Sequence, residues 1–229
     1  MKIQVFIDAA AVAAEAAQLI AREGRAAIAA RGRFSLAVSG GQTPWLMLRA
    51  LACEDLPWQS VYLAQVDERV APAGHPDRNL THLHESLLER VPLSPGQICA
   101  MPVEASDLEA AAVRYARMLQ EIAGVPPVLD LVHLGLGPDG HTASLVPGDP
   151  VLDIAGADVA VTGLYQQRRR MTLTYPLLNR ARLVLWVVTG AEKAGMLLRL
   201  REGDPTIPAG RVDRNHAVVL ADRAAAGKL

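Results

Sequence analysis

The stretch Arg33-Phe-Ser-Leu-Ala-Val-Ser-Gly-Gly-Gln-Thr-Pro44 decides the fold, because an apolar run ends there at two glycines and a helical pattern begins. Residues 33–38 have the composition and length of a buried β-strand, and residues 43–52 have the spacing of a helix. Thr43 and Pro44 fit the N-cap and the first helical position. The stretch therefore predicts a strand, a tight turn and a helix in direct succession.

The same alternation extends to both sides of this stretch. Residues 3–7 are predicted to be extended and residues 8–31 helical, and a further strand is expected at residues 61–66. Later in the chain, helices are predicted near residues 79–90, 106–122 and 191–201, and strands at residues 129–134, 171–174 and 182–189. Short strands that alternate with helices indicate an α/β protein with a mostly parallel sheet.

Local signals support the boundaries of these helices. Ser106 and Glu109 have the spacing of a capping box, in which two side chains satisfy free N–H groups at a helix start. Gly124 and Gly203 stand where two of the helices are expected to stop, because glycine accepts the backbone conformation that ends a helix.

Length and composition limit the class of protein. The chain has 229 residues, 51% hydrophobic and 21% charged, and its 23 basic residues nearly balance 24 acidic ones. These values are typical of a soluble globular protein, and a net charge of -1 argues against a nucleic-acid partner. No apolar run is long enough to span a membrane and no signal-peptide pattern is present, so we expect a cytoplasmic protein without a membrane partner. We expect residues 1–229 to form a single domain.

The two cysteines, Cys53 and Cys99, have neither Cys-x-x-Cys spacing nor a disulfide framework around them. We interpret both as ordinary reduced thiols. His75, His82, His84 and His216 have no metal-like pairing with carboxylates or cysteines, so the sequence predicts no metal site.

In an open α/β sheet, ligands bind outside the carboxyl ends of the strands, so the loops that follow strands are the first places to look for a site. The first such loop contains Ser39, Gly40, Gly41 and Thr43. Its backbone N–H groups and two hydroxyls lie at a helix start and suit a phosphate cradle. A plain tight turn with a helix cap explains the same residues equally well.

The second loop begins with Asp67, Glu68 and Arg69 and leads to Arg78 and Asn79 at the next helix. Each of these residues alone is compatible with a solvated loop or a helix cap. Together they place carboxylates for positioning or acid–base work, and guanidinium groups for a phosphate, at the same sheet edge as the first loop.

The third loop is Gly135-Leu-Gly-Pro-Asp-Gly-His-Thr142, which matches the pattern G-x-G-x-x-G. A dinucleotide fingerprint should open a long helix at its third glycine, but Pro147 follows too soon and Pro138 removes a backbone donor from the turn. We therefore do not expect a nicotinamide or flavin cofactor. The loop presents Asp139 and His141 at a strand tip, where a histidine can act as a base near neutral pH.

Two further cationic side chains lie close to the ends of predicted strands: one follows a strand and the other precedes one. Lys193 lies in the first turn of a predicted helix, against the helix dipole, which suggests an anionic ligand, although simple exposure to solvent explains it too. Arg170 ends a run of three arginines before a short strand, and it is positioned to turn toward a phosphate.

Four segments of the chain match the pattern of one known family: Leu36–Pro44, Asp67–Arg69, Gly135–Leu145 and Arg170–Thr174. Together they resemble the glucosamine-6-phosphate isomerase/6-phosphogluconolactonase family, and more specifically its lactonases. The order and spacing agree over nearly the whole chain, and the continuation Thr142-Ala-Ser-Leu145 favours the lactonases over the deaminases, which carry a further glutamate there. The sequence departs from the family pattern at Val146, near Arg78 and at His133, where the family usually has an apolar residue.

The resemblance implies a three-layer α/β/α sandwich with a Rossmann-like sheet and a carboxylic ester hydrolase without cofactor or metal. The implied reaction is hydrolysis of 6-phospho-D-glucono-1,5-lactone to 6-phospho-D-gluconate, the second step of the oxidative pentose phosphate pathway. Its implied partner is this small phosphosugar lactone, and we expect the protein to be a monomer or a weak homodimer. His141 is the expected base, and Asp67 and Asp139 are expected to orient it or to fix its loop. The residues expected to bind the phosphate are Ser39, Gly40, Gly41, Thr43, Arg78, Arg170 and Lys193.

Two alternative functions stay open at this point. A deaminase or isomerase of amino-sugar phosphates would use Asp67 to move a proton at C2 and His141 to open the ring. A non-enzymatic sugar-phosphate sensor would bind without turnover, and such regulators usually carry a DNA-binding helix-turn-helix ahead of this domain. Because the first strand is expected to start at Ile3, we rank the sensor last.

Overall fold

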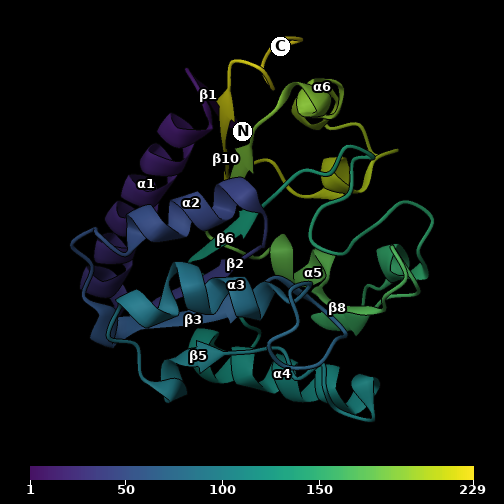
Figure 1. Cartoon of the computed structure of the whole chain (residues 1–229). Coiled ribbons are helices and arrows are strands. Elements are labelled where there is room, and N and C mark those ends of the chain that lie inside the picture. The colour runs from purple at the N-terminus through teal and green to yellow at the C-terminus, as the bar shows by residue number, and fades with distance from the viewer.

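The computed structural model describes all 229 residues and is built around a parallel sheet of seven strands (Figure 1). The strands are ordered β1-β10-β9-β6-β2-β3-β5 across the sheet. The predicted strand before the first glycine-rich loop and the predicted strand after the following helix are present, and the mostly parallel sheet is confirmed. The strand bounds are β1 (Lys2–Phe6), β2 (Phe34–Val38), β3 (Val61–Gln65), β5 (Ile98–Cys99), β6 (Leu131–Leu134), β9 (Val184–Val188) and β10 (Ala217–Asp222).

A second, antiparallel sheet of three strands lies beside the first and has the order β4-β8-β7. Its strands are β4 (Asp67–Arg69), β7 (Val159–Val161) and β8 (Arg170–Leu173). The Leu173 backbone N–H donates to the carbonyl of Val66 over 2.9 Å, which joins this small sheet to the end of β3. The small sheet therefore holds the segment after β3 at the carboxyl edge of the large sheet.

Helices cover both faces of the large sheet (Figure 1). One apolar core lies between the sheet and α1, α2 and α3, and a second core lies between the sheet and α4, α5 and α6. This arrangement is the expected three-layer α/β/α sandwich. The helix bounds are α1 (Ala9–Arg31), α2 (Gln42–Leu51), α3 (Asn79–Ser86), α4 (Leu108–Ala123), α5 (Tyr175–Leu178) and α6 (Ala194–Glu202). Short 3-10 turns occur at Trp58–Ser60, Leu88–Arg90, Pro95–Gln97, Pro150–Asp153, Ala191–Lys193 and Pro208–Arg211.

The sequence explains the close packing of α1. The Asp8 carboxylate accepts from the Ala11 N–H over 2.9 Å and caps the helix start, and Gly32 ends the helix in the left-handed conformation with φ 74°. Most of the buried residues of α1 are alanines, whose small side chains allow the helix to pack closely. Its partner strand β2 is buried on both faces, as expected for a central parallel strand.

Two predicted helix starts are wrong. Gly41, not Thr43, is the N-cap of α2, because its φ of 135° lets the chain turn into the helix earlier, and Thr43 lies inside the first turn. Asp107, not Ser106, caps α4, and its carboxylate accepts from the Ala110 N–H over 2.9 Å. The predicted stops at Gly124 and Gly203 are confirmed.

The order of the strands creates a crevice at one edge of the large sheet. From β2 the chain continues to β3 and β5 on one side, whereas from β6 it continues to β9 and β10 on the other. The loops that leave the carboxyl ends of β2 and β6 therefore diverge, which is where open α/β sheets bind ligands. None of the helices is both long and apolar enough to cross a bilayer.

Candidate active site

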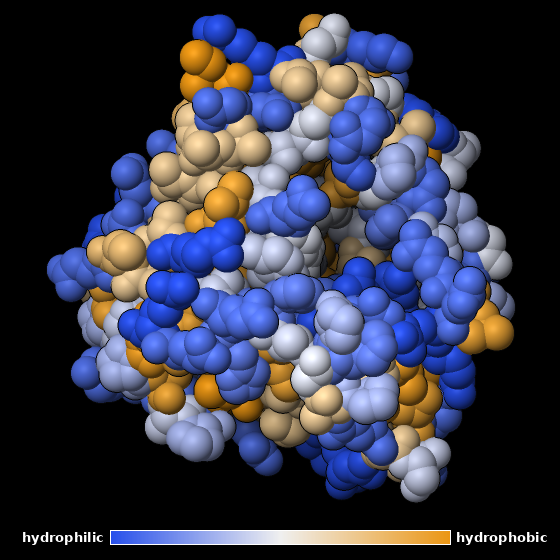
Figure 2. Space-filling model, in the orientation of Figure 1, coloured by the Kyte–Doolittle hydropathy of each residue, from blue (hydrophilic) through white to orange (hydrophobic).

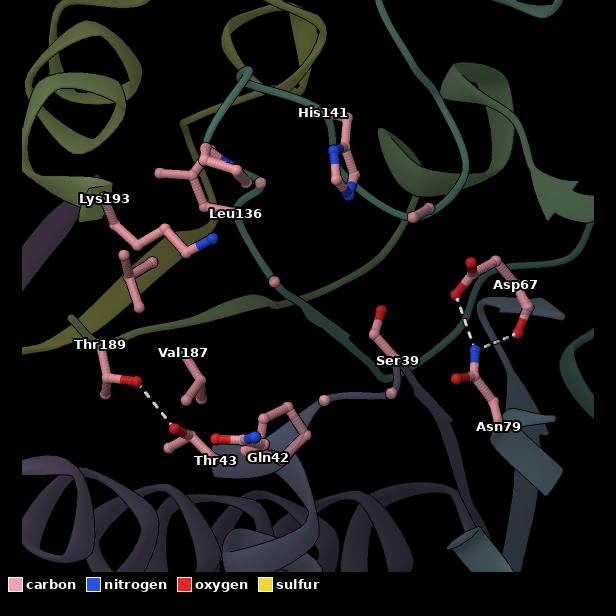
Figure 3. Close-up of a pocket in the computed structure, with 18 of the residues that line it drawn as sticks. Ser39, Gln42, Thr43, Asp67, Asn79, Leu136, His141, Val187, Thr189 and Lys193 are labelled. Atoms are coloured by element: carbon pink, nitrogen blue, oxygen red, sulfur yellow. Dashed lines mark hydrogen bonds between the residues drawn. The ribbon is translucent and has the colours of Figure 1, made fainter. Parts of the chain in front are cut away.

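A cavity of about 350 Å³ opens at this divergence point, and its lining is predominantly polar. Figure 2 shows a hollow near the middle of the face seen in Figure 1, with hydrophilic residues around much of its rim. All four loops singled out in the sequence contribute to the cavity, through residues such as Ser39, Asp67, His141 and Lys193. Figure 3 shows the His141 ring, the Lys193 amine and the Ser39 hydroxyl directed toward the same space from three different loops.

The loop after β2 forms a tight floor. The Ser39 N–H donates to Nδ1 of His133 over 3.2 Å, and the Ser39 hydroxyl donates to the His133 carbonyl over 3.0 Å. A Cβ atom at Gly40 would collide with the side chain of Asn79, so only glycine fits there. The N–H groups in the first turn of α2 have no intrahelical acceptor and suit an anion.

The start of α2 is also tied to the loop after β9, which is separated from β2 by β6 in the sheet. The hydroxyls of Thr43 and Thr189 are 2.7 Å apart and share a hydrogen bond (Figure 3). Thr189 follows β9 and precedes Lys193, so this bond fixes the loop after β2 against the loop that carries the lysine. Both threonines line the cavity.

The loop after β6 holds a histidine–carboxylate pair. Asp139 Oδ1 lies 2.5 Å from Nδ1 of His141 and also accepts from the His141 backbone N–H over 3.1 Å. A Cβ atom at Gly137 would collide with the His141 ring, so the glycine allows the ring to fold back over the loop. Because Asp139 occupies Nδ1, the Nε2 atom is the ring nitrogen left for a substrate.

Asp139 is held as a carboxylate. Its partial burial opposes ionisation, but the hydrogen bonds from the His141 backbone and ring and from the Tyr165 hydroxyl outweigh this effect and lower the pKa of Asp139. Asp139 is therefore negatively charged near neutral pH and suited to orient the imidazole.

Asp67 has different partners. Its Oδ2 accepts from the Ser144 hydroxyl over 2.6 Å, and the Asn79 amide donates to the Asp67 carbonyl over 3.0 Å and to its Oδ1 over 3.3 Å. Asp67 lines the cavity, while Asp139 is the carboxylate in contact with His141. The sequence left open which of the two touches the histidine, and the structure brings Asp139 to it.

The arginines of the site differ from the expected set. Arg69 and Arg170 line the cavity, and Arg78 does not. The Arg78 guanidinium is turned inward, where Nε lies 3.1 Å from the Glu68 carboxylate and Nη1 donates to the Ala71 carbonyl over 2.8 Å. Arg78 therefore lies outside the cavity lining, where its guanidinium offsets the buried charge of Glu68.

Arg69 and Arg170 each keep a buried Nε atom without a hydrogen-bond partner. Burial lowers the pKa of Arg170, and the nearby charge of Arg69 lowers it further. Lys193 reaches the cavity from the 3-10 turn before α6, and no carboxylate lies within ion-pair distance of it. The three cations therefore leave positive charge in the cavity that a bound anion would offset.

Sequence reasoning missed several residues at the site. Asn79 was interpreted as a possible helix cap, although its side chain reaches Asp67 and Arg69. Thr189 and Glu192 lie on either side of Gly190 in the loop after β9 and line the cavity. Their position after the carboxyl end of a strand was the signal that could have identified them. Tyr165, which contacts Asp139, lies in an irregular segment and carried no local signal.

The fold and the cavity have the features of α/β enzymes that hold a small phosphorylated ligand at the carboxyl edge of a parallel sheet. Residues 7–221 match the family described as glucosamine-6-phosphate isomerases/6-phosphogluconolactonase, and the chain belongs to this family.

Relatives in this family agree with the match. A 6-phosphogluconolactonase from Synechocystis is 40% identical over 78% of this chain and 77% of its own length. The human 6-phosphogluconolactonase is 36% identical over 90% of this chain and 83% of its own length. The solved structure of 6-phosphogluconolactonase from Trypanosoma cruzi superposes with a TM-score of 0.88 over 100% of this chain and 96% of that chain, at 26% identity.

Proposed function

We propose that this protein is a 6-phosphogluconolactonase, which hydrolyses 6-phospho-D-glucono-1,5-lactone to 6-phospho-D-gluconate in the oxidative pentose phosphate pathway. The observation that carries the proposal is that His141, which Asp139 holds at Nδ1, lines a cavity whose cations have no ion-pair partner. The names of the relatives from Synechocystis and human support the same reaction.

The proposed chemistry needs a base and a stabilised oxyanion. His141 Nε2 takes a proton from water as the water oxygen bonds to C1 of the lactone. The C1–ring oxygen bond then breaks, and the ring oxygen receives the proton from His141, which gives the free acid and restores the base. Backbone N–H groups of the Gly40–Gly41 turn or the Gly135–Gly140 loop would stabilise the charge on the carbonyl oxygen.

The distal phosphate supplies binding energy and places C1 against the water. Lys193, the hydroxyls of Ser39 and Thr43 and the free N–H groups at the start of α2 are the proposed phosphate ligands at one side of the cavity. Arg69 and Arg170 provide positive charge on the other side, and Arg69 takes the place that the sequence gave to Arg78.

We propose that a single chain builds each active site. Every side chain of the proposed machinery comes from this chain, which supports a protein that acts as a monomer or a weak homodimer. The small, polar cavity suits a phosphosugar, and we propose that the protein works in the cytoplasm without a nucleic-acid or membrane partner.

The test is hydrolysis of freshly generated 6-phosphogluconolactone, corrected for its spontaneous opening. We expect the wild type to turn over the lactone and His141→Ala to lose about 100-fold or more of kcat, in line with the loss of a general base. His84→Ala, on the exposed side of α3, serves as the matched control and should behave as wild type. Turnover of glucosamine 6-phosphate without lactone hydrolysis would replace the lactonase proposal with the deaminase.

A further inference from the structure

A hairpin outside the four loops reaches the catalytic pair. Strands β7 and β8 are joined by a loop in which the Tyr165 N–H donates to the Arg168 carbonyl over 3.0 Å and the Arg168 N–H donates back over 3.2 Å. Gln166 and Gln167 between them have φ values of 50° and 66°. Two residues in the left-handed region form the compact kind of turn that matches strand twist, so the position of Tyr165 is defined by the backbone.

Tyr165 makes three contacts at this position. Its hydroxyl donates to Oδ2 of Asp139 over 3.1 Å, which is the oxygen that His141 does not use. Its ring meets the His141 ring edge-on, with the ring centroids 5.6 Å apart. The guanidinium carbon of Arg170 lies 4.9 Å from the centroid of the same ring.

We propose that Tyr165 is a positioning residue for the reaction proposed above: its hydroxyl holds Asp139 in the orientation that fixes His141, and its ring holds Arg170 at the cavity wall. The proposal rests on the proposed function for its kinetic consequences. In this role the β7–β8 hairpin supports Asp139 and Arg170 from outside the glycine-rich loops.

The geometry explains why the histidine needs this support. Asp139 and His141 are two residues apart on one loop, and the Asp139 side chain is 36% exposed. With only the histidine as partner, the carboxylate could rotate and carry the imidazole with it. The hydroxyl of Tyr165 comes from a different element, so Asp139 is fixed from two sides.

Tyr165 remains a donor throughout the neutral range. Its partial burial and the negative charge of Asp139 raise the pKa of the phenol, so the hydroxyl keeps its proton. The groups in contact with the His141 ring are Asp139 on its own loop and Tyr165 from the hairpin, and the charged Arg170 lies over the Tyr165 ring. Asp67, Arg69, Glu192 and Lys193 line the same cavity.

The experiment compares Tyr165→Phe, which keeps the ring and removes the hydroxyl, with Tyr165→Leu, which removes both. We expect Tyr165→Phe to lose about tenfold in kcat with unchanged KM, because a hydrogen bond to a charged group is removed. The acid limb of the pH profile of kcat/KM, where activity falls with falling pH, should move to higher pH. The reason is that Asp139 attracts the imidazolium of His141 more strongly once the phenol no longer donates to it. Tyr165→Leu should in addition raise KM, since Arg170 loses the ring beneath it.

Tyr175→Phe is the matched control. Its hydroxyl donates to the Pro208 carbonyl over 2.9 Å and its ring lies 4.8 Å from the guanidinium carbon of Arg211, so it loses a similar hydrogen bond away from the cavity. We expect its acid limb and KM to match those of wild type. A general loss of stability would lower activity in both phenylalanine variants without moving the acid limb of either.

A second readout needs no substrate. The His141 ring is titrated by nuclear magnetic resonance, with its signals assigned by their absence in His141→Gln. Tyr165→Phe should shift the titration midpoint of His141 upward relative to wild type. An unchanged midpoint and an unchanged acid limb would overturn the role of Tyr165. If the wild type does not hydrolyse the lactone, the proposed function fails, and the midpoint alone decides whether Tyr165 holds the pair.

Discussion

Arg69 on β4 and Arg170 on β8 stand directly opposite each other in an antiparallel pair of strands, and both reach the same cavity. Like charges in directly opposed positions destabilise a sheet unless something offsets them. The neighbouring Asp67 supplies one negative charge, and Asn79 and Gln166 bind one nitrogen of Arg69 and of Arg170, respectively. An anionic ligand between the two guanidinium groups would therefore stabilise both the complex and the small sheet.

Arg69→Gln should affect ligand binding, whereas Arg78→Gln should affect the stability of the fold. Arg69→Gln is expected to raise KM about tenfold or more, because a charged contact to the ligand is lost. Arg78→Gln is expected to leave KM near wild type and to lower the free energy of unfolding by about 3 kcal/mol or more, because Glu68 is fully buried and loses its ion-pair partner.

Steady-state kinetics and urea unfolding of the two variants measure these effects. An increase in KM for Arg78→Gln with wild-type KM for Arg69→Gln would return the phosphate role to Arg78. Equal KM values for all three proteins would remove both arginines from ligand binding.

Asp139→Asn and Asp67→Asn should separate the two carboxylates of the site. Asp139→Asn removes the negative charge beside the His141 ring, so the acid limb of kcat/KM should move to lower pH and kcat should fall about tenfold or more. Asp67→Asn leaves the acid limb in place, because the Asp67 carboxylate bonds to Ser144 and Asn79 instead. A shift of the limb in Asp67→Asn and none in Asp139→Asn would reverse the two assignments.

Lys193→Ala should raise KM more than it lowers kcat. The lysine reaches the cavity without an intramolecular ion pair, and its proposed contact with the distal phosphate exists before and during the reaction. Lys2→Ala, on the exposed part of β1, is the control for a change in net charge. Wild-type KM in Lys193→Ala would remove Lys193 from the site.

His133 should make the stability of the fold depend on pH. Burial lowers the pKa of His133 to about 3, and the imidazole Nε2 has no partner. In the unfolded chain the same residue takes a proton below about pH 6.5, whereas the folded protein resists it, so stability is lost as pH falls. As the pH falls from 7 to 5, protonation of His133 in the unfolded chain should lower the free energy of unfolding by about 2 kcal/mol.

His133→Leu supplies the comparison, measured by urea unfolding at both pH values. The variant should lose this part of the pH dependence, even though its stability at pH 7 falls because the Ser39 N–H loses its acceptor. The same loss between pH 7 and pH 5 in both proteins would show that other groups cause the acid sensitivity.

The sequence predicted the elements that are specified locally. Helix α1 has a cap at Asp8 and a stop at Gly32, and strand β2 is apolar except for Ser35, so each carries its own signal. The four loops of the site were found because the carboxyl ends of parallel strands meet at one edge. Strand β10 was missed although its apolar run has the composition of a buried strand.

Other features depend on contacts that no local pattern contains. Strand β4 is three polar residues long and exists because Arg170–Leu173 pairs with it from a hundred residues away. The inward turn of Arg78 depends on Glu68, and the contact of Tyr165 with Asp139 depends on how a hairpin folds over a loop. Side-chain direction in such segments follows from tertiary packing, which a single sequence does not reveal.

The position of β10 determines when the large sheet can be completed during synthesis. Strand β1 is made first, but its only partner in the sheet is β10, which is made last and lies between β1 and β9. Until β10 leaves the ribosome, β1 has no strand to pair with and β9 has an open edge. The nascent chain must therefore keep β1 unpaired until all the other strands of the sheet have been made, and β10 then closes the sheet by inserting between β1 and β9.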